Sequence, residues 1–378
     1  VGQCQLIEIA KALSKNVKLL ILDEPTAALN EDDSENLLEL LGQLRDQGVT
    51  CILITHRLKE VVKVADTITV LRDGSTVGSL DNSGQRIEER EIIRHMVGRD
   101  IANIYPKQEG HTFGEVCLDV KDWTVFDPVS NKEILHNINL HVRKGEIVGI
   151  AGLMGAGRTE LALSLFGNTP GYKITSGTME LKGKPAKFKS PKQAIRAGLA
   201  YATENRKKNG LVLIQDILYN ITVANLDELT HGLVVNENEE IVVANKYKES
   251  INIKAPSVRQ TVGNLSGGNQ QKVVLARWMF AKPDVLILDE PTRGIDVGAK
   301  FEIYSLMNKL VDAGMGIILI SSELLEVIGM ADRIYAMCEG RLTGEISREE
   351  ATEANVMAMM TNTAQETDKA PAAEGELV

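Results

Sequence analysis

Aromatic residues and cysteines are scarce in this chain of 378 residues, and positive charge is not in excess. Phe, Trp and Tyr make up 4% of the sequence, and the four cysteines lie far apart without a C-x-x-C pair. This spacing argues against a disulfide framework or a structural zinc site and favours a reducing compartment. The net charge of −10 argues against a partner made mainly of phosphate backbone, so no nucleic acid is expected.

Long hydrophobic runs are also missing. No apolar stretch reaches the roughly 18 residues that a membrane-spanning helix needs, and nothing resembles a signal peptide. Any association with a membrane is therefore expected to run through a partner. The chain starts with Val1 rather than Met and enters in the middle of a pattern, which predicts an N-terminal truncation.

An internal repeat is present instead. The stretch LLILDEPTAAL (19–29) returns as VLILDEPTRGI (285–295), so that Asp23 recurs as Asp289 after 266 positions. The same shift pairs Gly48 with Gly314 without gaps, and a register held this long predicts two copies of one domain. The predicted division is the C-terminal half of a first domain (1–96), a linker (97–115), a complete second domain (116–360) and a disordered acidic tail (361–378).

Hydrophobic periodicity predicts the fold class α/β. Short apolar runs that read as buried strands alternate with amphipathic helical segments such as 34–48, which Gly48 ends. Such alternation predicts a mostly parallel sheet built from βαβ units. Before it, 124–127, 133–142 and 177–183 predict an antiparallel β layer, and 210–262 predicts a helical subdomain. The predicted buried strands are 17–22, 50–55 and 66–71, with counterparts at 284–289, 316–321 and 332–337.

A glycine-rich stretch, GLMGAGRT (152–159), directly follows the apolar run IVGIA. It fits the phosphate-binding loop G-x-x-x-x-G-K-[ST] except that Arg158 stands where Lys is required. The order of strand, turn and helix presents backbone N–H groups to an anion, so a nucleotide site is predicted. The planar guanidinium keeps the charge but not the shape of Lys, which puts efficient phosphoryl transfer in doubt. The nucleotide-binding candidates are Gly152, Gly155, Ala156, Gly157, Arg158 and Thr159.

An acidic pair ends the core strand of each copy. Asp23 with Glu24, and Asp289 with Glu290, are each followed by Pro-Thr. In such pairs the first acid holds Mg²⁺ and the second polarises the attacking water. With the hydroxyl of Thr159 as a further Mg²⁺ ligand, the expected cofactors are ATP and Mg²⁺. Trp123 and Phe126 both precede the loop at a distance suited to stacking on adenine, with core packing as the alternative; Phe126 is preferred.

The segment LSGGNQQK (265–272) resembles the signature motif of ABC-type ATPases, at that family's distance before the acidic strand. The resemblance implies a duplicated P-loop NTPase fold of ABC type, with domains meeting head to tail so that each ATP lies between one phosphate loop and the other signature. It also places His56 as a switch histidine, with Ser322 as its counterpart, and Glu204 where the family usually has a Gln near Mg²⁺. The signature residues are then Ser266, Gly267, Gly268 and Gln270 in the second copy, and Gly2 and Gln3 in the first.

The resemblance predicts two composite sites of unequal quality. The site with Arg158, Glu290 and Ser322 faces the altered signature VGQ, whereas the other combines Glu24 and His56 with the intact signature. Hydrolysis is therefore expected mainly at the site with Glu24 and His56, where Glu24 is the base. Since its phosphate loop would precede Val1, the chain as given is expected to hydrolyse ATP poorly or not at all, and a nonhydrolysing nucleotide-binding remnant stays open.

Tandem domains together with GLMGAGRTE resemble the ATP-binding subunits of bacterial monosaccharide importers, which take ribose, xylose, arabinose or galactose; the xylose or multiple-sugar branch is the nearest in pattern. This implies a sugar-transporting translocase bound peripherally at the cytoplasmic face of the inner membrane. Its partners would be an integral membrane permease and a periplasmic or external sugar-binding protein. The alternative is a soluble tandem ABC ATPase acting on ribosomes or nucleic acid, which the acidic composition disfavours.

Overall fold

The structure is a computed structural model that forms two compact units, one built mainly from residues up to Ile104 and the other mainly from Tyr105 onward. The division falls inside the segment 97–115. Each unit is described by itself. The residues described are 7, 11, 17–26, 29, 31–55, 57–72, 74–84, 86–97, 104–106, 112–167, 171–231 and 234–361.

A six-stranded sheet forms the centre of the second unit. Its first five strands are parallel and the last is antiparallel. Every residue of the strands in its middle is buried, as expected for a parallel sheet covered on both faces. The strand order is β10 (Leu199–Ala202), β13 (Val285–Asp289), β14 (Gly316–Ile320), β7 (Ile147–Gly152), β15 (Arg333–Cys338) and β16 (Arg341–Ser347).

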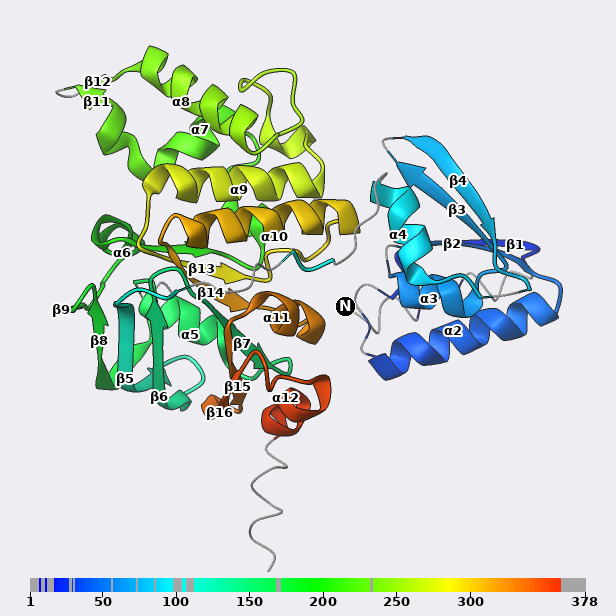
Figure 1. The fold of residues 1–378 in the computed structure, drawn as a ribbon, viewed down its shortest axis with the longest axis horizontal. Coiled ribbons are helices and arrows are strands. Elements are labelled where there is room, and N and C mark those ends of the chain that lie inside the picture. Colours follow the sequence, from blue (N-terminus) through cyan, green and yellow to red (C-terminus); the bar gives the residue numbers. More distant parts are fainter. Residues whose placement is uncertain are drawn as a thin grey trace, which may run out of the picture. The chain divides into compact units, whose positions relative to one another are not determined.

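Helices cover both faces of this sheet. Figure 1 shows α9 (Gly267–Ala281) and α10 (Val297–Asp312) on one side of β13 and β14, and α5 (Arg158–Leu165) on the other. The remaining helices against the sheet are α6 (Pro191–Ala197), α11 (Leu324–Met330) and α12 (Glu353–Met360). This layered arrangement confirms the predicted α/β class.

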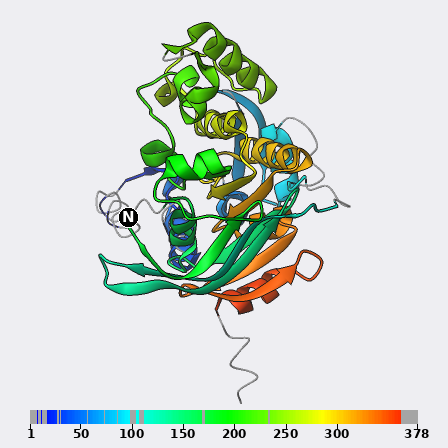
Figure 2. The ribbon, with the colours of Figure 1, turned by 90° about the vertical axis from the view of Figure 1, so that its left-hand side faces the viewer.

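An antiparallel layer of four strands lies beside the central sheet, as predicted. Its order is β6 (Lys132–Arg143), β5 (Val116–Asp127), β8 (Lys173–Leu181) and β9 (Lys184–Pro185). Figure 2 shows the long β5 and β6 strands at the end of this unit opposite to the helical region that follows β10.

That helical region confirms the predicted subdomain. It contains the turn η1 (Arg206–Gly210), α7 (Ile217–Thr222), η2 (Val223–Leu229) and α8 (Glu237–Ser250), with the small hairpin β11 (Thr230–His231) and β12 (Val234–Val235), and the turn η3 (Val262–Asn264) before α9. Arg277 of α9 ties it together, because its guanidinium donates to the main-chain oxygen of Asn220 at 2.6 Å and to the side-chain oxygen at 2.9 Å.

The first unit contains a parallel pair of strands, β1 (Leu19–Asp23) and β2 (Thr50–Ile54), and an antiparallel pair, β3 (Thr67–Arg72) and β4 (Ser75–Asp81). Its helices are α2 (Glu31–Asp46), α3 (Leu58–Val64) and α4 (Glu89–Val97). Leu20 and Leu22 of β1 pack against Leu37, Leu38 and Leu41 of α2. The buried leucines at helical spacing explain why the segment 34–48 was predictable as a helix.

Equivalent elements of the two units have the same internal register. The pair β1–β2 begins with Leu19 opposite Thr50, and β13–β14 begins with Val285 opposite Gly316, each 266 positions later. The hairpins β3–β4 and β15–β16 even share an irregularity, between Val70 and Leu71 in one and 266 positions later in the other. Helix α2 has the same length as α10, and α3 has the same length as α11. Each helix of the first unit begins 266 positions before its counterpart.

The prediction of buried strands is wrong for one face of β1 and β2. Leu20 and Leu22 are buried, but Leu19 and Ile21 are 51% and 59% exposed, and Ile52 and Ile54 on β2 are also exposed. In the second unit the equivalent residues are buried, and there β10 and β7 flank the pair and α5 contacts β13. The described part of the first unit contains no counterpart of β7, β10 or α5.

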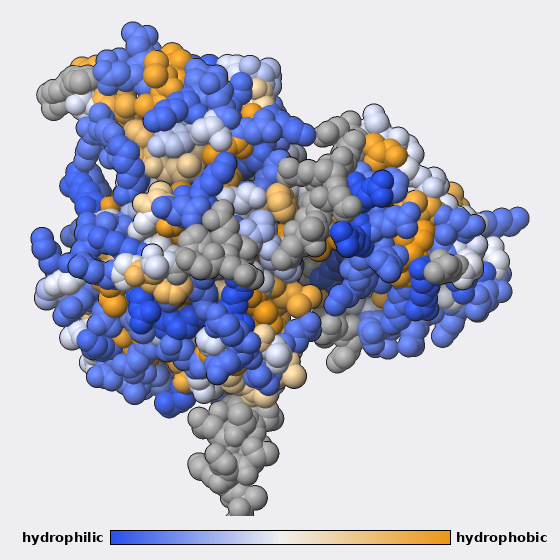
Figure 3. Space-filling view, in the orientation of Figure 1, coloured by the Kyte–Doolittle hydropathy of each residue, from blue (hydrophilic) through white to orange (hydrophobic). Residues whose placement is uncertain are grey.

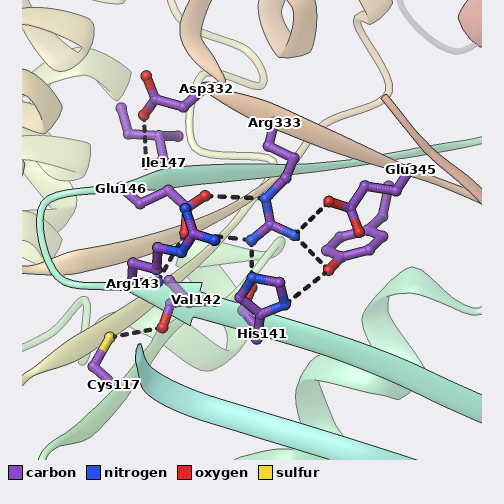
Figure 4. Close-up of polar contacts among 10 residues, drawn as sticks. Cys117, His141, Val142, Arg143, Glu146, Ile147, Asp332, Arg333 and Glu345 are labelled. Carbon is purple, nitrogen blue, oxygen red and sulfur yellow. Dashed lines mark hydrogen bonds and ion pairs between the residues drawn. The ribbon is translucent and has the colours of Figure 1, made fainter. Parts of the chain in front are cut away.

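A polar cluster fixes the start of the strand that leads into the glycine-rich loop. Figure 4 shows Arg333 between Glu146 and Glu345; its guanidinium donates to Glu146 at 3.0 Å and to the main-chain oxygen of His141 at 2.8 Å. The carboxylate of Asp332 accepts a bond from the backbone N–H of Ile147 at 2.8 Å. Because Glu146 is 1% exposed, this pairing holds β7 and β15 together at their first residues.

The face shown in Figure 3 is mostly hydrophilic, with smaller hydrophobic areas. Exposed apolar side chains in the helical region include Val212 and Ile214, which are 40% and 85% exposed. Among the residues that the structure describes, no helix has both the length and the apolar composition needed to cross a bilayer.

Candidate nucleotide site

The glycine-rich loop lies between the end of β7 and the start of α5. A side chain at Gly152 would place its Cβ 2.8 Å from the main-chain oxygen of Met337, so the neighbouring strand leaves room only for glycine. Gly157 has a φ of 102°, in the left-handed region that favours glycine, directly before α5 begins at Arg158. The loop thus turns from a buried strand into a helix, as the sequence predicts for a phosphate-binding loop.

Thr159 and Asp289 meet beside this loop. The Thr159 hydroxyl donates to Oδ2 of Asp289 at 2.9 Å, and the Tyr201 hydroxyl donates to the same oxygen at 2.8 Å. Asp289 is 2% exposed, and burial raises the pKa of its carboxyl to about 6, against the two hydrogen bonds that lower it. Within the described part of the chain, its Oδ1 is buried without a hydrogen-bond partner.

This donor set fits Mg²⁺. A hydroxyl next to a carboxylate with one unused oxygen supplies the hard oxygen ligands that the ion prefers, and Mg²⁺ at nucleotide sites takes one or two protein ligands and completes its shell with phosphate and water. Thr159 and Asp289 would therefore hold the ion, as the sequence predicts for both residues. Tyr201 was not predicted, because a tyrosine in a buried strand is no signal for a role in ion binding.

Arg158 reaches across to the loops that follow β13 and β14. Its guanidinium donates to the main-chain oxygen of Ser321, and it lies 3.8 Å from the carboxylate of Glu290. The Ser322 hydroxyl donates to Glu290 at 2.9 Å. Burial raises the pKa of Glu290, while the positive charge of Arg158 and the bond from Ser322 act in the opposite direction. The structure thus brings together three residues that the sequence assigned to one site.

Glu204 lies next to the same site but is already paired. Its carboxylate forms a close ion pair with Arg293, three residues after Glu290. An acid at this position could instead cap the following helical turn, but that role belongs to Asn205, which accepts from the backbone N–H of Lys208. Arg293 was missed in the sequence, although it differs from Ala27 at the equivalent position of the first repeat.

Trp123 and Phe126, the two candidates for stacking on adenine, differ in burial. Trp123 is 3% exposed and its indole N–H donates to the Ser164 hydroxyl of α5 at 3.1 Å, so it belongs to the core. Phe126 lies three residues further along β5 and is half-buried. Phe126 therefore remains the candidate for stacking on adenine.

The signature segment begins helix α9. Ser266 is the N-cap residue, and its hydroxyl accepts from the side-chain N–H of Asn269 at 2.9 Å. Gly267 cannot carry a side chain without meeting the main-chain oxygen of Gly294 at 3.0 Å. Gln270 is 3% exposed and donates to the main-chain oxygen of Leu265, so it holds the preceding turn from inside the unit.

In the first unit, Asp23 and Glu24 lie at the end of β1. The backbone N–H of Glu24 donates to Ile54 at 2.8 Å, and the N–H of Glu290 donates to Ile320 at the same distance; both glutamates have positive φ, 45° and 51°. Asp23 is exposed whereas Asp289 is buried. Gly2, Gln3 and His56 lie outside the described residues.

Comparison with known proteins decides the family. The sequence profile of the family described as ABC transporter matches residues 135–293. The chain is 58% identical over 365 residues to the L-arabinose transport ATP-binding protein of Geobacillus stearothermophilus, covering 96% of this chain and 71% of that protein. The chain belongs to the ABC transporter family of ATP-binding proteins.

Other ABC proteins show the same relationship. The xylose import ATP-binding protein of Thermoanaerobacter pseudethanolicus is 51% identical, with 94% of this chain and 70% of that protein covered. The ribose import ATP-binding protein of Lactococcus lactis subsp. cremoris is 45% identical, with 96% and 71% covered.

A solved structure shows the same ABC fold. A nucleotide-free ATP-binding cassette from an ABC transporter superposes with a TM-score of 0.55 at 21% identity, covering 65% of this chain and 96% of that one. The predicted P-loop NTPase fold of ABC type is thereby confirmed.

Proposed function

We propose that this chain is the ATP-binding subunit of an importer, and that it couples ATP hydrolysis to the uptake of a monosaccharide. The observation that carries the proposal is the contact between Thr159 and Asp289 beside the glycine-rich loop, because it joins the phosphate-binding element to the acidic strand. The relatives named for L-arabinose, xylose and ribose support a pentose as substrate. Xylose, which the sequence pattern favours, is one member of that class.

ATP with Mg²⁺ is the proposed nucleotide of the second unit. The backbone N–H groups of residues 152–157 and the start of α5 would receive the phosphates, and Phe126 would stack on the base. Bound Mg²⁺ would supply charge neutralisation for the phosphates, with Thr159 and Asp289 as its protein ligands. Glu204 would lie beside the ion once its pairing with Arg293 loosens.

We propose that the site of the second unit, with Arg158 and Glu290, binds ATP but hydrolyses it slowly. Glu290 has the position of the base, yet its carboxylate faces the Arg158 guanidinium and accepts a hydrogen bond from Ser322. Both partners stabilise the ionised form of Glu290, but they also occupy the carboxylate that would have to bind the attacking water. Ser322 also offers no imidazole where the family places its histidine. Glu24 carries the same backbone geometry in the first unit, and we propose it as the stronger base.

The importer would also include a membrane permease and an external sugar-binding protein. We propose that the permease contacts the segment before α7 and the first turn of that helix, where Val212, Ile214 and Tyr219 are exposed on the helical subdomain. The protein would then lie peripherally on the cytoplasmic face of the inner membrane.

Uptake measurements test the function. Cells lacking the gene should lose uptake of radiolabelled L-arabinose, D-xylose or D-ribose at low external concentration, and the intact gene should restore it while a Glu24→Gln variant should not. In parallel, affinity purification from solubilised membranes should recover an integral membrane protein. Normal uptake of all three sugars together with recovery of RNA would contradict the proposal.

A further inference from the structure

A further buried carboxylate of the second unit belongs neither to the glycine-rich loop nor to the acidic pair Asp289 and Glu290. Glu326, in α11, is 1% exposed. One of its oxygens accepts from the Thr292 hydroxyl at 2.9 Å, and the other accepts a close bond from the Ser321 hydroxyl. Thr292 and Ser321 are themselves buried, so this is an internal three-residue link.

The link joins the two loops that carry the reactive groups. Thr292 comes two residues after Glu290, on the loop that follows β13, and Ser321 follows β14. Ser321 also accepts the Arg158 guanidinium through its main-chain oxygen. A carboxylate that binds both hydroxyls therefore fixes how far Glu290 lies from Arg158 and Ser322.

The first unit contains the glutamate–threonine contact of this link. The Thr26 hydroxyl donates to Glu60 at 2.8 Å, and these residues lie 266 positions before Thr292 and Glu326. Thr26 is 1% exposed and Glu60 is 8% exposed. The second oxygen of Glu60 accepts from Arg57 at 3.1 Å.

The second partner of the two carboxylates and the charge around them differ, because Glu326 accepts from Ser321 and Glu60 accepts from Arg57. Arg57 neutralises Glu60 directly, whereas the equivalent position in the second unit is Glu323, whose carboxylate pairs with Lys300 at 2.6 Å. What both units keep is the contact between the glutamate and the threonine after the acidic pair.

Packing alone is a poor reason for this arrangement. Burying a carboxylate costs free energy that its hydrogen bonds only partly offset, and an apolar pair of similar volume stabilises a core at least as well. Two hydrogen bonds of fixed direction, in contrast, set a distance between loops that apolar contacts leave adjustable.

We propose that Glu326 and Glu60 are positioning residues for ATP hydrolysis, each locking the loop after its acidic strand through a buried threonine so that Glu290 or Glu24 is held at a fixed place. The inference rests on the proposed ATPase function, because only turnover would reveal a displaced base. Neither glutamate is expected to touch the nucleotide.

Threonine variants in the assembled importer provide the test. Replacing Thr26 and Thr292 together by Val removes both hydroxyls at nearly constant volume and should lower kcat by about tenfold while KM for ATP stays within about twofold. Replacing both by Ser keeps the hydroxyls and should retain kcat within about twofold. Combining the Val pair with Glu60→Gln and Glu326→Gln should add less than about threefold, because both changes break the same link.

A matched control separates positioning from stability. Leu37→Ala in the core of the first unit should lower the melting temperature without lowering kcat. The proposal is overturned if the Val pair turns over ATP normally, if the Ser pair is as slow as the Val pair, or if Leu37→Ala slows turnover as much as the Val pair at an equal loss of melting temperature. Absence of ATP turnover in the unaltered importer would instead contradict the proposed function itself.

Discussion

The guanidinium of Arg158 lies 3.8 Å from the carboxylate of Glu290, and each side chain is only 10% exposed. The residue that departs from the phosphate-loop pattern thus faces the residue proposed as base of the same site. At such burial the pairing is weakly screened, and a carboxylate engaged with a guanidinium is less available to polarise water. Arg158, which replaces the Lys of the loop pattern, and Ser322, which stands where the family has a histidine, therefore both contact the carboxylate of Glu290.

Restoring the two ordinary residues should raise turnover. Combining Arg158→Lys with Ser322→His replaces the planar fork by a compact charge and adds an imidazole, so ATP hydrolysis in a Glu24→Gln background should rise by roughly tenfold. Phosphate release from the purified protein measures it. Adding Glu290→Gln is the control, and a gain that survives this addition would contradict the assignment of Glu290.

Removal of Mg²⁺ should weaken nucleotide binding. With a chelator present, the affinity for a fluorescent ATP analogue should fall by about tenfold, which is ~1.4 kcal/mol, because the phosphates lose their neutralising ion. Thr159→Val should reproduce most of this loss and respond little to added Mg²⁺, whereas Thr175→Val, an exposed position on β8, serves as a matched control. If the affinity for the ATP analogue depended equally on Mg²⁺ in the unaltered protein, Thr159→Val and Thr175→Val, this would argue against Thr159 as a ligand of the ion.

The two aromatic residues of β5 should give opposite results. Trp123→Ala should lower the free energy of unfolding by about 3–5 kcal/mol, because it empties a buried site and leaves the Ser164 hydroxyl without its donor. Phe126→Ala should leave unfolding nearly unchanged and weaken ATP binding roughly three- to tenfold. Denaturant titration and nucleotide titration on both variants measure this. Unchanged affinity in Phe126→Ala would remove it from the site.

Stability should increase on moderate acidification. Burial raises the pKa of Glu326 to about 7, with Glu323 also raising it and Lys300 and the two hydroxyls lowering it. Tyr304 and Tyr105 also face this group and are themselves protonated in this range, because burial raises the pKa of both. Since the folded state binds the proton more tightly than the unfolded state, this contribution is largest below the unfolded pKa of 4.5 and is lost as pH rises through about 7.

Denaturant titration at two pH values measures that contribution. From pH 7.5 to 5.5 the free energy of unfolding should rise by about 2 kcal/mol more in the unaltered protein than in Glu326→Gln. The difference between the two proteins isolates this group from other carboxylates. Equal pH dependence would show that Glu326 titrates normally.

Much of the fold was predictable because the signals were local. The repeat of LLILDEP, the strand before GLMGAGRT and the helix ended by Gly48 all lie within short windows, and each element forms where expected. The exposed faces of Leu19 and Ile21 were not predictable, because burial of a strand depends on elements that are distant in sequence.

The sequence could predict which residues belong to the site but not which of them contact one another. Thr159, Asp289 and Glu290 could be named from motifs, whereas the engagement of Arg158 with Ser321 and Glu290, and of Glu204 with Arg293, required coordinates. Tyr201 carried no sequence signal, because a buried hydroxyl reads like any other residue of a strand. Glu326 recurs 266 positions after Glu60, but the repeat alone did not show that both carboxylates are buried and bonded to a threonine.

The identity of the nucleotide retained by the second unit tests the central claim most directly. Protein carrying Glu24→Gln is loaded with stoichiometric radiolabelled MgATP, separated from free nucleotide, and sampled over time for the ratio of ATP to ADP. The account predicts that the label stays bound as ATP over many minutes and that Thr159→Val prevents its retention. Rapid conversion to ADP that Glu290→Gln abolishes would contradict it, because Glu290 would then be a working base despite its contact with Arg158.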